Sequence, residues 1–231
     1  MRLPPNLLRA KFLSRPNRFA AWAELDAEAV YCYMPNPGRM HELLHPGAEM
    51  WLKHSPADGR HTSHEVVLVR HPQSLVCLDT RLPPSLFLEA LESGLLPELG
   101  ACLEVRREVP FGRSRLDLAL ACDTGHWLIE TKSCTLTIDG VARFPDAPTL
   151  RGARHMEELI EAGKQGHTPA VAFVIQRPDA TVFAPKADTD PVFAAALRRA
   201  AGEGVQVFAL TCKVTRRAVT PVGRIAVDLD R

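Results

Sequence analysis

Two alternating apolar runs joined by a tight turn lie in the middle of the chain and constrain its fold more than any other stretch. Residues 114–136 read SRLDLALACDTGHWLIETKSCTL, with a turn at Asp123-Thr124-Gly125. Alternation with period two on both sides of such a turn predicts two neighbouring strands. Glu130 and Lys132 are two residues apart and therefore share a face. Pairing across the turn is expected to bring Asp117 beside them.

This trio of charges is costly on apolar strands, because a buried charge without its partner costs about 3–5 kcal/mol. A divalent metal would explain it. Asp117 and Glu130 are the predicted ligands of one Mg²⁺ or Mn²⁺, a hard cation that takes oxygen ligands and keeps several waters. Lys132 would orient or deprotonate the attacking water and offset developing charge. The Asp…Glu-x-Lys pattern is that of PD-(D/E)xK nucleases.

The alternative interpretation of these residues is a strand-end salt bridge on a solvated sheet face. Two features favour the catalytic interpretation. Glu130-Thr131-Lys132 is the one Glu-x-Lys in the sequence, and the chain has six lysines against 22 arginines. A basic residue needed for its charge alone would more often be Arg in such a chain.

Composition bounds the class of protein. The 231 residues fit one large domain or two small ones, and 46% hydrophobic with 24% charged residues is typical of a globular chain. The net charge of +1 means that any nucleic-acid-binding face must be a local patch. No run approaches the ~20 apolar residues of a membrane span, and the N-terminus lacks the apolar core of a signal peptide. We therefore expect a cytoplasmic protein without a membrane partner.

The cysteines are scattered and form no Cys-x-x-Cys motif. This spacing argues against a zinc ribbon or a disulfide framework. It predicts free thiols in a reducing compartment. The six positions are Cys32, Cys77, Cys102, Cys122, Cys134 and Cys212.

Residues 1–80 read as short strands separated by turn chemistry, such as Pro35-Asn36-Pro37-Gly38 and Pro46-Gly47. Five or six short strands in this length predict a small β-barrel of the OB type. The expected strands are residues 7–14, 19–25, 30–34, 48–54, 65–70 and 74–78.

The OB fold often binds single strands through a basic groove with aromatic platforms. Arg15, Arg18 and Arg39 lie in or beside turns and are the candidate nucleic-acid contacts of this half. The aromatic side chains have two interpretations, a stacking platform or the barrel core, and we expect the core. They are Phe19, Trp22, Tyr31, Tyr33 and Trp51.

Residues 81–231 change to an α/β (α+β) pattern in which helices and strands share a mixed central sheet. A helix over 86–93, begun by Ser85, precedes strands at 104–110, 115–121 and 127–133. A helix from Thr149 to 162 follows, then strand 170–175, helix 191–202, strand 205–213 and short stretches at 218–222 and 225–229. The opening order matches the PD-(D/E)xK core. Glu89 on the first helix is either a further metal ligand or a solvated helix residue.

At this point the sequence resembles the sugar fermentation stimulation protein A family over nearly its whole length. The resemblance implies an OB-like N-terminal domain, a nuclease-like C-terminal domain, DNA binding and a role in regulating sugar (maltose) metabolism genes. By position it implies a site of Asp117, Glu130 and Lys132, with Arg151 and His155 nearby. We expect Arg115, Arg151 and His155 to be the nucleic-acid contacts of this half. The blocks that carry it are residues 35–40, 114–117, 129–133, 135–136, 144–147, Thr149, Arg151-Gly152, His155 and residues 174–177.

The sequence departs from the family pattern at helix positions near this site. Leu150 stands where Glu is usual and Ala153 where Gln is usual, while Thr131 replaces an apolar residue between Glu130 and Lys132. These departures leave two main functions open: a Mg²⁺-dependent nuclease, or a DNA-binding regulator that retains the fold without turnover. A small-molecule sensor using an inter-domain cleft is a third. Strandedness and oligomeric state stay open, a dimer being one option.

Overall fold

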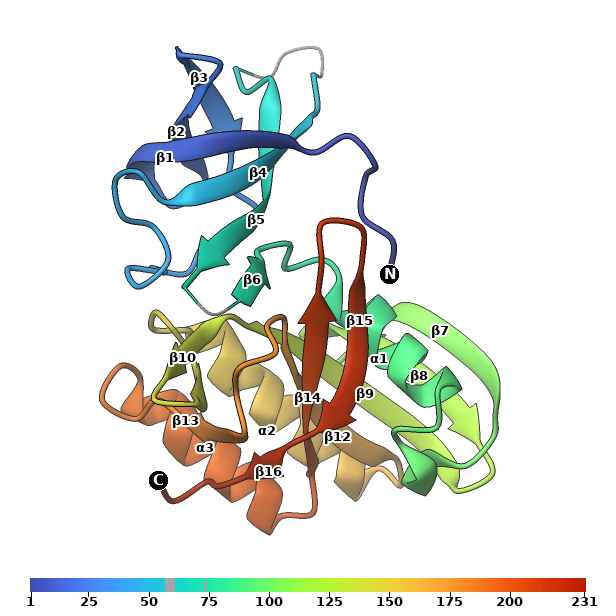
Figure 1. Ribbon diagram of the computed structural model, residues 1–231. Helices are drawn as coiled ribbons and strands as arrows, with labels where there is room; N and C mark the ends of the chain where they lie inside the picture. Colours follow the sequence, from blue (N-terminus) through green and yellow to red (C-terminus); the bar gives the residue numbers. More distant parts are fainter. Residues whose placement is uncertain (57–60, 73) are drawn as a thin grey trace.

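The first third of the chain forms a closed barrel (Figure 1). The computed structural model describes residues 1–56, 61–72 and 74–231. The sheet order is β3-β2-β1-β4-β5-β6, and a parallel pairing of β3 with β5 closes the barrel over β1 to β5. The predicted OB-like barrel is confirmed. Its strands are β1 (Leu8–Asn17), β2 (Ala20–Leu25), β3 (Glu28–Tyr33), β4 (Glu49–His54), β5 (His64–His71) and β6 (Ser74–Cys77).

The rest of the chain is built on a mixed sheet of order β15-β14-β12-β9-β8-β7. Its strands β9, β12 and β14 run parallel, and the pairs toward both edges are antiparallel. This confirms the predicted mixed central sheet. The bounds are β7 (Cys102–Phe111), β8 (Ser114–Cys122), β9 (Gly125–Cys134), β12 (Thr168–Ile175), β14 (Gln206–Val214) and β15 (Val219–Arg224).

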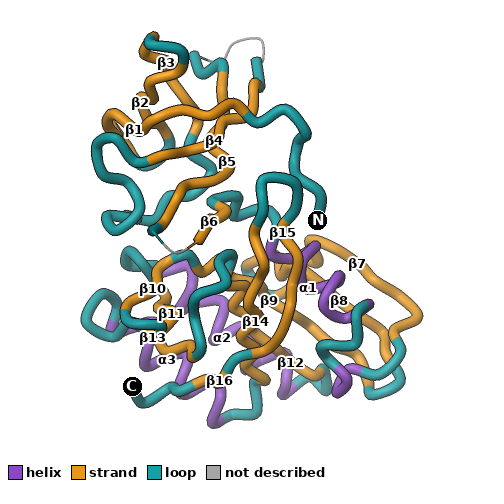
Figure 2. Tube along the Cα trace, viewed as in Figure 1, coloured by secondary structure: helices purple, strands orange, loops and turns teal. Residues whose placement is uncertain are grey.

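A smaller sheet of order β10-β11-β13-β16 lies beside the main one (Figure 2). Sequence analysis missed three of its strands, because segments of three or four residues carry too little alternation to be recognised. The strands are β10 (Leu136–Ile138), β11 (Val141–Phe144), β13 (Val182–Pro185) and β16 (Ala226–Val227).

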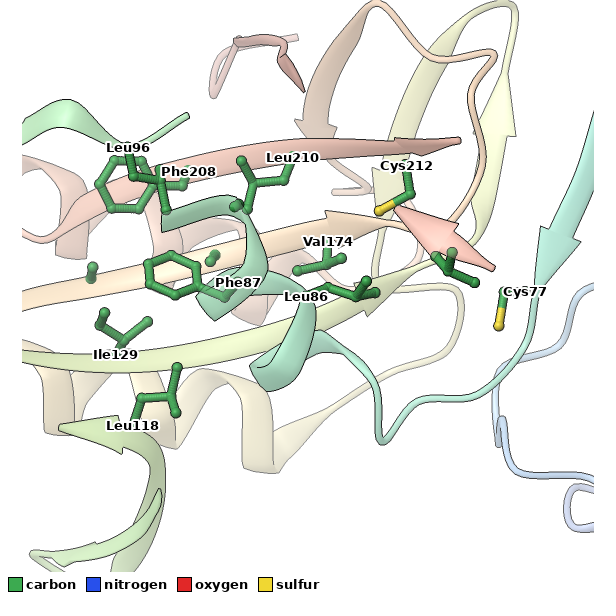
Figure 3. Packing of buried hydrophobic residues seen from close by; sticks show 14 of the residues in the cluster. Cys77, Leu86, Phe87, Leu96, Leu118, Ile129, Val174, Phe208, Leu210 and Cys212 are labelled. Carbon is green, nitrogen blue, oxygen red and sulfur yellow. The ribbon is translucent and has the colours of Figure 1, made fainter. Parts of the chain in front are cut away.

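Helices cover the main sheet on both faces. One face packs on α1 (Pro83–Glu92), whose Leu86 and Phe87 contact a buried cluster with Leu118 and Ile129 (Figure 3). The other face packs on α2 (Leu150–Lys164) and α3 (Pro191–Gly202). A 3₁₀ turn, η1 (Pro97–Leu99), leads from α1 into β7. Strand residues therefore alternate between two separate cores, and the face of a residue decides which helix it meets.

The helix starts follow simple capping chemistry. Thr149 Oγ1 accepts the backbone N–H of Gly152 at 3.0 Å and caps α2, as predicted. Asp190 caps α3 by accepting from Phe193 N at 2.9 Å, and its other oxygen accepts from Thr149 N at 2.7 Å. One carboxylate thus joins the two helix starts. The first helix begins at Pro83 and not after Ser85, since proline is well suited to the first helical turn.

Direct contacts join the barrel to the α/β part. Met40 N donates to Asp146 Oδ2 at 2.6 Å, and Cys77 and Gln176 exchange hydrogen bonds of 3.0 and 3.1 Å. Trp51 on β4 is 2% exposed and packs in the same cluster as α1. The β4–β5 side of the barrel is therefore packed against the α/β part.

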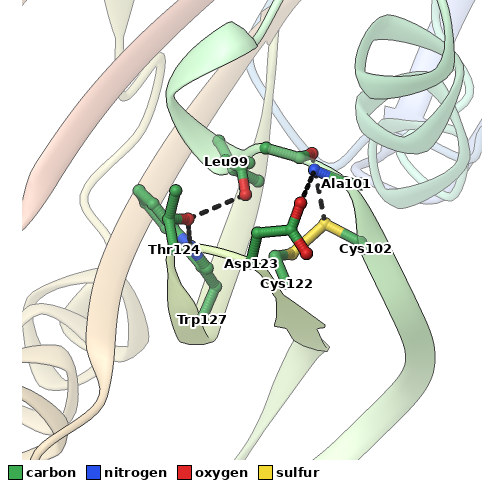
Figure 4. The surroundings of a disulfide bond; sticks show 8 residues. Leu99, Ala101, Cys102, Cys122, Asp123, Thr124 and Trp127 are labelled. Carbon is green, nitrogen blue, oxygen red and sulfur yellow. Dashed lines mark hydrogen bonds between the residues drawn. A yellow bond between two sulfur atoms is a disulfide. The ribbon is translucent and has the colours of Figure 1, made fainter.

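One disulfide corrects the prediction of free thiols throughout. Cys102 on β7 and Cys122 on β8 are directly opposite in the antiparallel register and are bonded (Figure 4). The two cysteines are 20 residues apart. Sequence analysis missed the pairing because it expected the first strand of this hairpin to begin at residue 104, which left Cys102 outside it. The other cysteines, at 32, 77, 134 and 212, are free and buried. Within the described ranges no helix has the length and apolar character required to cross a membrane.

Candidate active site

The site begins where β8 separates from β9. The antiparallel pairing of these two strands ends at the pair Leu118–Ile129. Beyond it, Asp117 Oδ2 accepts the backbone N–H of Thr131 at 2.8 Å and its hydroxyl at 2.5 Å. The carboxylate thus bonds the strand amide that a neighbouring strand would otherwise satisfy. Thr131, noted as a departure from the family pattern, helps to fix the orientation of Asp117.

Glu130 lies next to Asp117 and is 3% exposed. Its Oε1 accepts Lys132 Nζ at 2.5 Å and contacts His155 Nδ1. Its Oε2 is buried and has no hydrogen-bond partner among the described residues. A buried carboxylate oxygen without a partner is unfavourable, so this atom marks a place where a ligand would be stabilised.

His155 on α2 contacts Glu130 Oε1 through Nδ1 and is 1% exposed. Arg151, one helical turn earlier, donates from Nε to His155 Nε2 at 3.2 Å. An Nε2 that accepts leaves the ring proton on Nδ1, where it is directed at Glu130. The chain Arg151–His155–Glu130 therefore fixes the glutamate, because helix residues at i and i+4 share a face.

The two carboxylates differ in their preference for a proton. Burial and the charge of Glu130 raise the pKa of Asp117 above its ordinary value. Burial also acts to raise the pKa of Glu130, but the hydrogen bond from His155 and the charge of Lys132 together lower it. The surroundings thus favour the anion at Glu130 and disfavour it at Asp117, and a nearby cation would favour the ionised form of Asp117 as well.

The donor set fits a hard divalent cation. Asp117 and Glu130 supply carboxylate oxygens, one of them the unpartnered Oε2. No group of three or more His, Cys, Asp or Glu side chains in the described residues is arranged to enclose a metal. The fit is therefore to an ion such as Mg²⁺, which one or two carboxylates hold while it keeps several waters.

A cleft of about 470 Å³ opens beside Lys132, between the barrel and the α/β part. Asn36, Pro37 and Gly38 form its wall on the barrel side, and Asn36 Nδ2 donates to Thr135 Oγ1 at 3.4 Å. The acidic residue in its lining, Asp146, is already bonded to Met40 N. The cleft has a net positive charge, because four basic residues outnumber this one carboxylate in its lining: Arg18, Lys132, Arg143 and Arg151.

The structure brings most predicted site residues together, but not all of them. Asp117, Glu130 and Lys132 meet at one point. Glu89 does not join them, because it lies on α1 at the opposite face of the sheet and binds the amino terminus of Met1.

The predicted nucleic-acid contacts also fall into different environments. Arg18 and Arg151 line the cleft, and Arg39 and Arg115 are exposed elsewhere. Arg15 instead donates to backbone oxygens of the 36–39 loop and of Arg18, so its guanidinium holds the loop. His155 is buried and orients Glu130 rather than facing a phosphate.

Sequence reasoning missed the roles of Thr131, Asn36 and Arg143. The motif Pro35-Asn36-Pro37-Gly38 was visible, but nothing in the sequence placed it against the nuclease-like half. Gly38 is needed there, because a Cβ would lie 2.9 Å from Asp146 Oδ2.

The fold and site define a class: an OB barrel followed by a nuclease-like α/β domain with Asp and Glu-x-Lys on adjoining strands. The chain belongs to the sugar fermentation stimulation protein family. The family model described as "Sugar fermentation stimulation protein RE domain" matches residues 81–218, and "SfsA N-terminal OB domain" matches residues 13–78.

Relatives match over nearly the full length. The sugar fermentation stimulation protein homolog of Moorella thermoacetica is 43% identical over 98% of this chain and 99% of its own. That of Desulforamulus reducens is 39% identical over 97% and 94%. A solved structure described as Pyrococcus furiosus SfsA in complex with Ca²⁺ superposes with a TM-score of 0.88, at 30% identity, covering 99% of this chain and 98% of that one.

Proposed function

We propose that this protein binds DNA and hydrolyses its phosphodiester bonds with Mg²⁺ or Mn²⁺ held by Asp117 and Glu130. The observation that carries the proposal is Glu130 Oε2, a buried carboxylate oxygen without a partner in the described part of the chain, beside a second carboxylate. The Ca²⁺ complex of the Pyrococcus furiosus relative supports a divalent cation in this family.

The bound cation would supply charge stabilisation at the phosphoryl oxygen and a lower pKa for its water. The residues of the chain do the rest. Lys132 Nζ, fixed by Glu130 at the cleft edge, donates to the attacking water or to the developing negative charge. Thr131 and His155 hold the two carboxylates in place. Arg151 and Arg18 face the cleft, where they would bind backbone phosphates.

The alternative is a DNA-binding regulator of sugar (maltose) metabolism genes that does not cleave. Two observations support it: the site offers two carboxylates as metal ligands, and the first residues of α2 differ from the family pattern. Leu150, in place of the usual Glu, is 84% exposed and offers no polar group to the site. Both functions predict salt-sensitive DNA binding, since phosphate contacts release counterions.

We further propose that residues 1–80 and 81–231 are the two domains, and that the protein works in the cytoplasm. Family-model matches ending at 78 and starting at 81 support the boundary. The resemblance to a cytoplasmic family supports the compartment, and the Cys102–Cys122 disulfide argues against it.

The test is strand cleavage by the purified protein with Mg²⁺ or Mn²⁺ on linear and circular, single- and double-stranded DNA. Glu130→Gln should abolish cleavage, and Glu89→Gln should retain it as the matched carboxylate control. Salt-sensitive binding without cleavage by the wild-type protein would leave the regulator as the function.

A further inference from the structure

We infer that the outer face of β2 and β3 is a stacking platform for single-stranded nucleic acid, which leads the strand into the cleft. This rests on the proposed function and adds the strandedness of its substrate. Trp22 on β2 pairs directly with Tyr31 on β3, with ring centroids 4.9 Å apart. Both point away from the barrel core, because the neighbouring Ala21, Ala23 and Cys32 point into it.

These rings are accessible where aromatic side chains are normally buried. Trp22 is 39% and Phe19 47% exposed. The prediction that the aromatic residues fill the barrel core is therefore wrong for these two, and Trp51 is buried instead in the cluster that contains Leu86 and Phe87 of α1. Flat rings on an OB sheet surface suit unpaired bases, because every base has a face that stacks and strands 2–3 of this fold commonly bind oligonucleotides.

The platform is continuous with the proposed active site. Arg18, in the β1–β2 turn, lies over the ring of Phe19 at 4.9 Å and also lines the cleft beside Lys132. Tyr33, at the end of β3, is three residues before Asn36 on the cleft wall. Three residues of extended chain span roughly 10 Å, so the two residues are at most about that far apart. A strand stacked on Trp22 and Tyr31 would pass Arg18 on its way to Lys132.

The charge along this path suits a phosphate backbone. A second groove of about 290 Å³ next to Arg18 is lined by Arg15, Arg39 and His41, and by no carboxylate of the described residues. Glu24, at the other end of β2, is 3.5 Å from Lys11. The path from platform to cleft is therefore predominantly basic, and this charge together with the exposed rings favours a nucleic acid.

The test compares binding of a (dT)₂₀ oligonucleotide and a 20-base-pair hairpin in EDTA. Trp22→Ala and Tyr31→Ala should each weaken (dT)₂₀ binding by about five-fold or more, since one lost stacking contact is worth ~1–3 kcal/mol. Hairpin affinity should change less than about two-fold. Leu103→Ala, at an exposed apolar position on β7, is the control and should change neither; Leu103 is 90% exposed, against 39% for Trp22.

Intrinsic fluorescence provides an independent readout. Trp51 and Trp127 are 2% and 5% exposed, so Trp22 is the tryptophan that a bound base can reach. (dT)₂₀ should quench wild-type emission, and Trp22→Phe should lose the quench while binding within about three-fold of the wild type, because phenylalanine still stacks.

Three results would overturn the inference. If Trp22→Ala binds (dT)₂₀ as tightly as the wild type, strands do not stack here, while the proposed function stands. If the variant instead converts a dimer to a monomer with unchanged DNA affinity, the face is a contact with a second copy. If the wild-type protein binds neither probe, the proposed function fails together with the platform.

Discussion

Asp117 Oδ2 accepts both the backbone N–H and the hydroxyl of Thr131, at 2.8 and 2.5 Å, at the point where β8 separates from β9. The strand separation therefore does not leave the Thr131 amide unpaired. It places one carboxylate beside the ionised Glu130, an arrangement that disfavours a second negative charge. A pair of this kind is destabilising for the fold alone and is useful when a cation binds.

Asp117→Asn is expected to stabilise the protein and abolish cleavage. The amide oxygen can still accept from Thr131, while the charge repulsion with Glu130 disappears. We expect a gain on the order of 1 kcal/mol in unfolding free energy at pH 7. Urea unfolding of both proteins measures it, and a loss of stability at neutral pH would contradict this description of the pair.

The pH dependence of that gain has a definite sign. A folded-state pKa raised above the ordinary 3.8 means that Asp117 contributes stability below that value, which is lost as pH rises through its folded pKa. The difference between Asp117→Asn and the wild type should therefore be small at acid pH and grow toward neutrality. A difference that shrinks as pH rises would show that Asp117 is stabilised as the anion.

Divalent cations should stabilise the wild-type protein through this site. Mg²⁺ or Mn²⁺ at 100 times its dissociation constant would add about 2.7 kcal/mol. Glu130→Gln should lose the shift in melting temperature, and Glu89→Gln should keep it because Glu89 lies on the opposite face. Binding should weaken as pH falls, since the cation competes with the proton on Asp117. An equal shift in Glu130→Gln would place the cation elsewhere.

Arg151 is expected to contact phosphate as well as hold His155. Arg151→Ala should reduce the salt dependence of DNA binding, lowering the slope of log K against log salt by roughly 0.7–0.9. Lys164, exposed at the far end of the same helix, provides the control. Identical slopes for Arg151→Ala and Lys164→Ala would remove Arg151 from the binding surface.

Reduction of the Cys102–Cys122 disulfide should lower stability. The bond joins two residues that are 20 positions apart in the sequence. In the chain-entropy model, a disulfide that closes a loop of this size stabilises the folded state by roughly 3 kcal/mol. Melting with and without a thiol reductant measures the effect. The double variant Cys102→Ser/Cys122→Ser should melt at the reduced value under both conditions, and a wild type insensitive to reductant would contradict the prediction.

Most of the architecture could be predicted from the sequence because local patterns specify it. Alternation revealed β8 and β9, and the Thr149 cap marked the start of α2. The trio of Asp117, Glu130 and Lys132 followed from strand periodicity across one turn. These are short-range relationships, which a single sequence records well.

What the sequence did not reveal depends on long-range contacts. His155 looked like a phosphate ligand and is a buried support, because its partner Glu130 is 25 residues away. Arg15 looked like a surface cation and instead holds the loop that carries Asn36. The Cys102–Cys122 bond and the exposure of Trp22 depend likewise on register and on which barrel side packs against α1.

The central claim is that Asp117 and Glu130 hold one divalent cation at the unpartnered oxygen of Glu130. Crystals soaked in Mn²⁺ and measured for anomalous scattering test it directly. We predict a peak contacted by Glu130 Oε2 and a carboxylate oxygen of Asp117, which is absent from Glu130→Gln crystals. A peak elsewhere with none between these carboxylates, at saturating Mn²⁺ and neutral pH, would contradict the metal site and with it the nuclease.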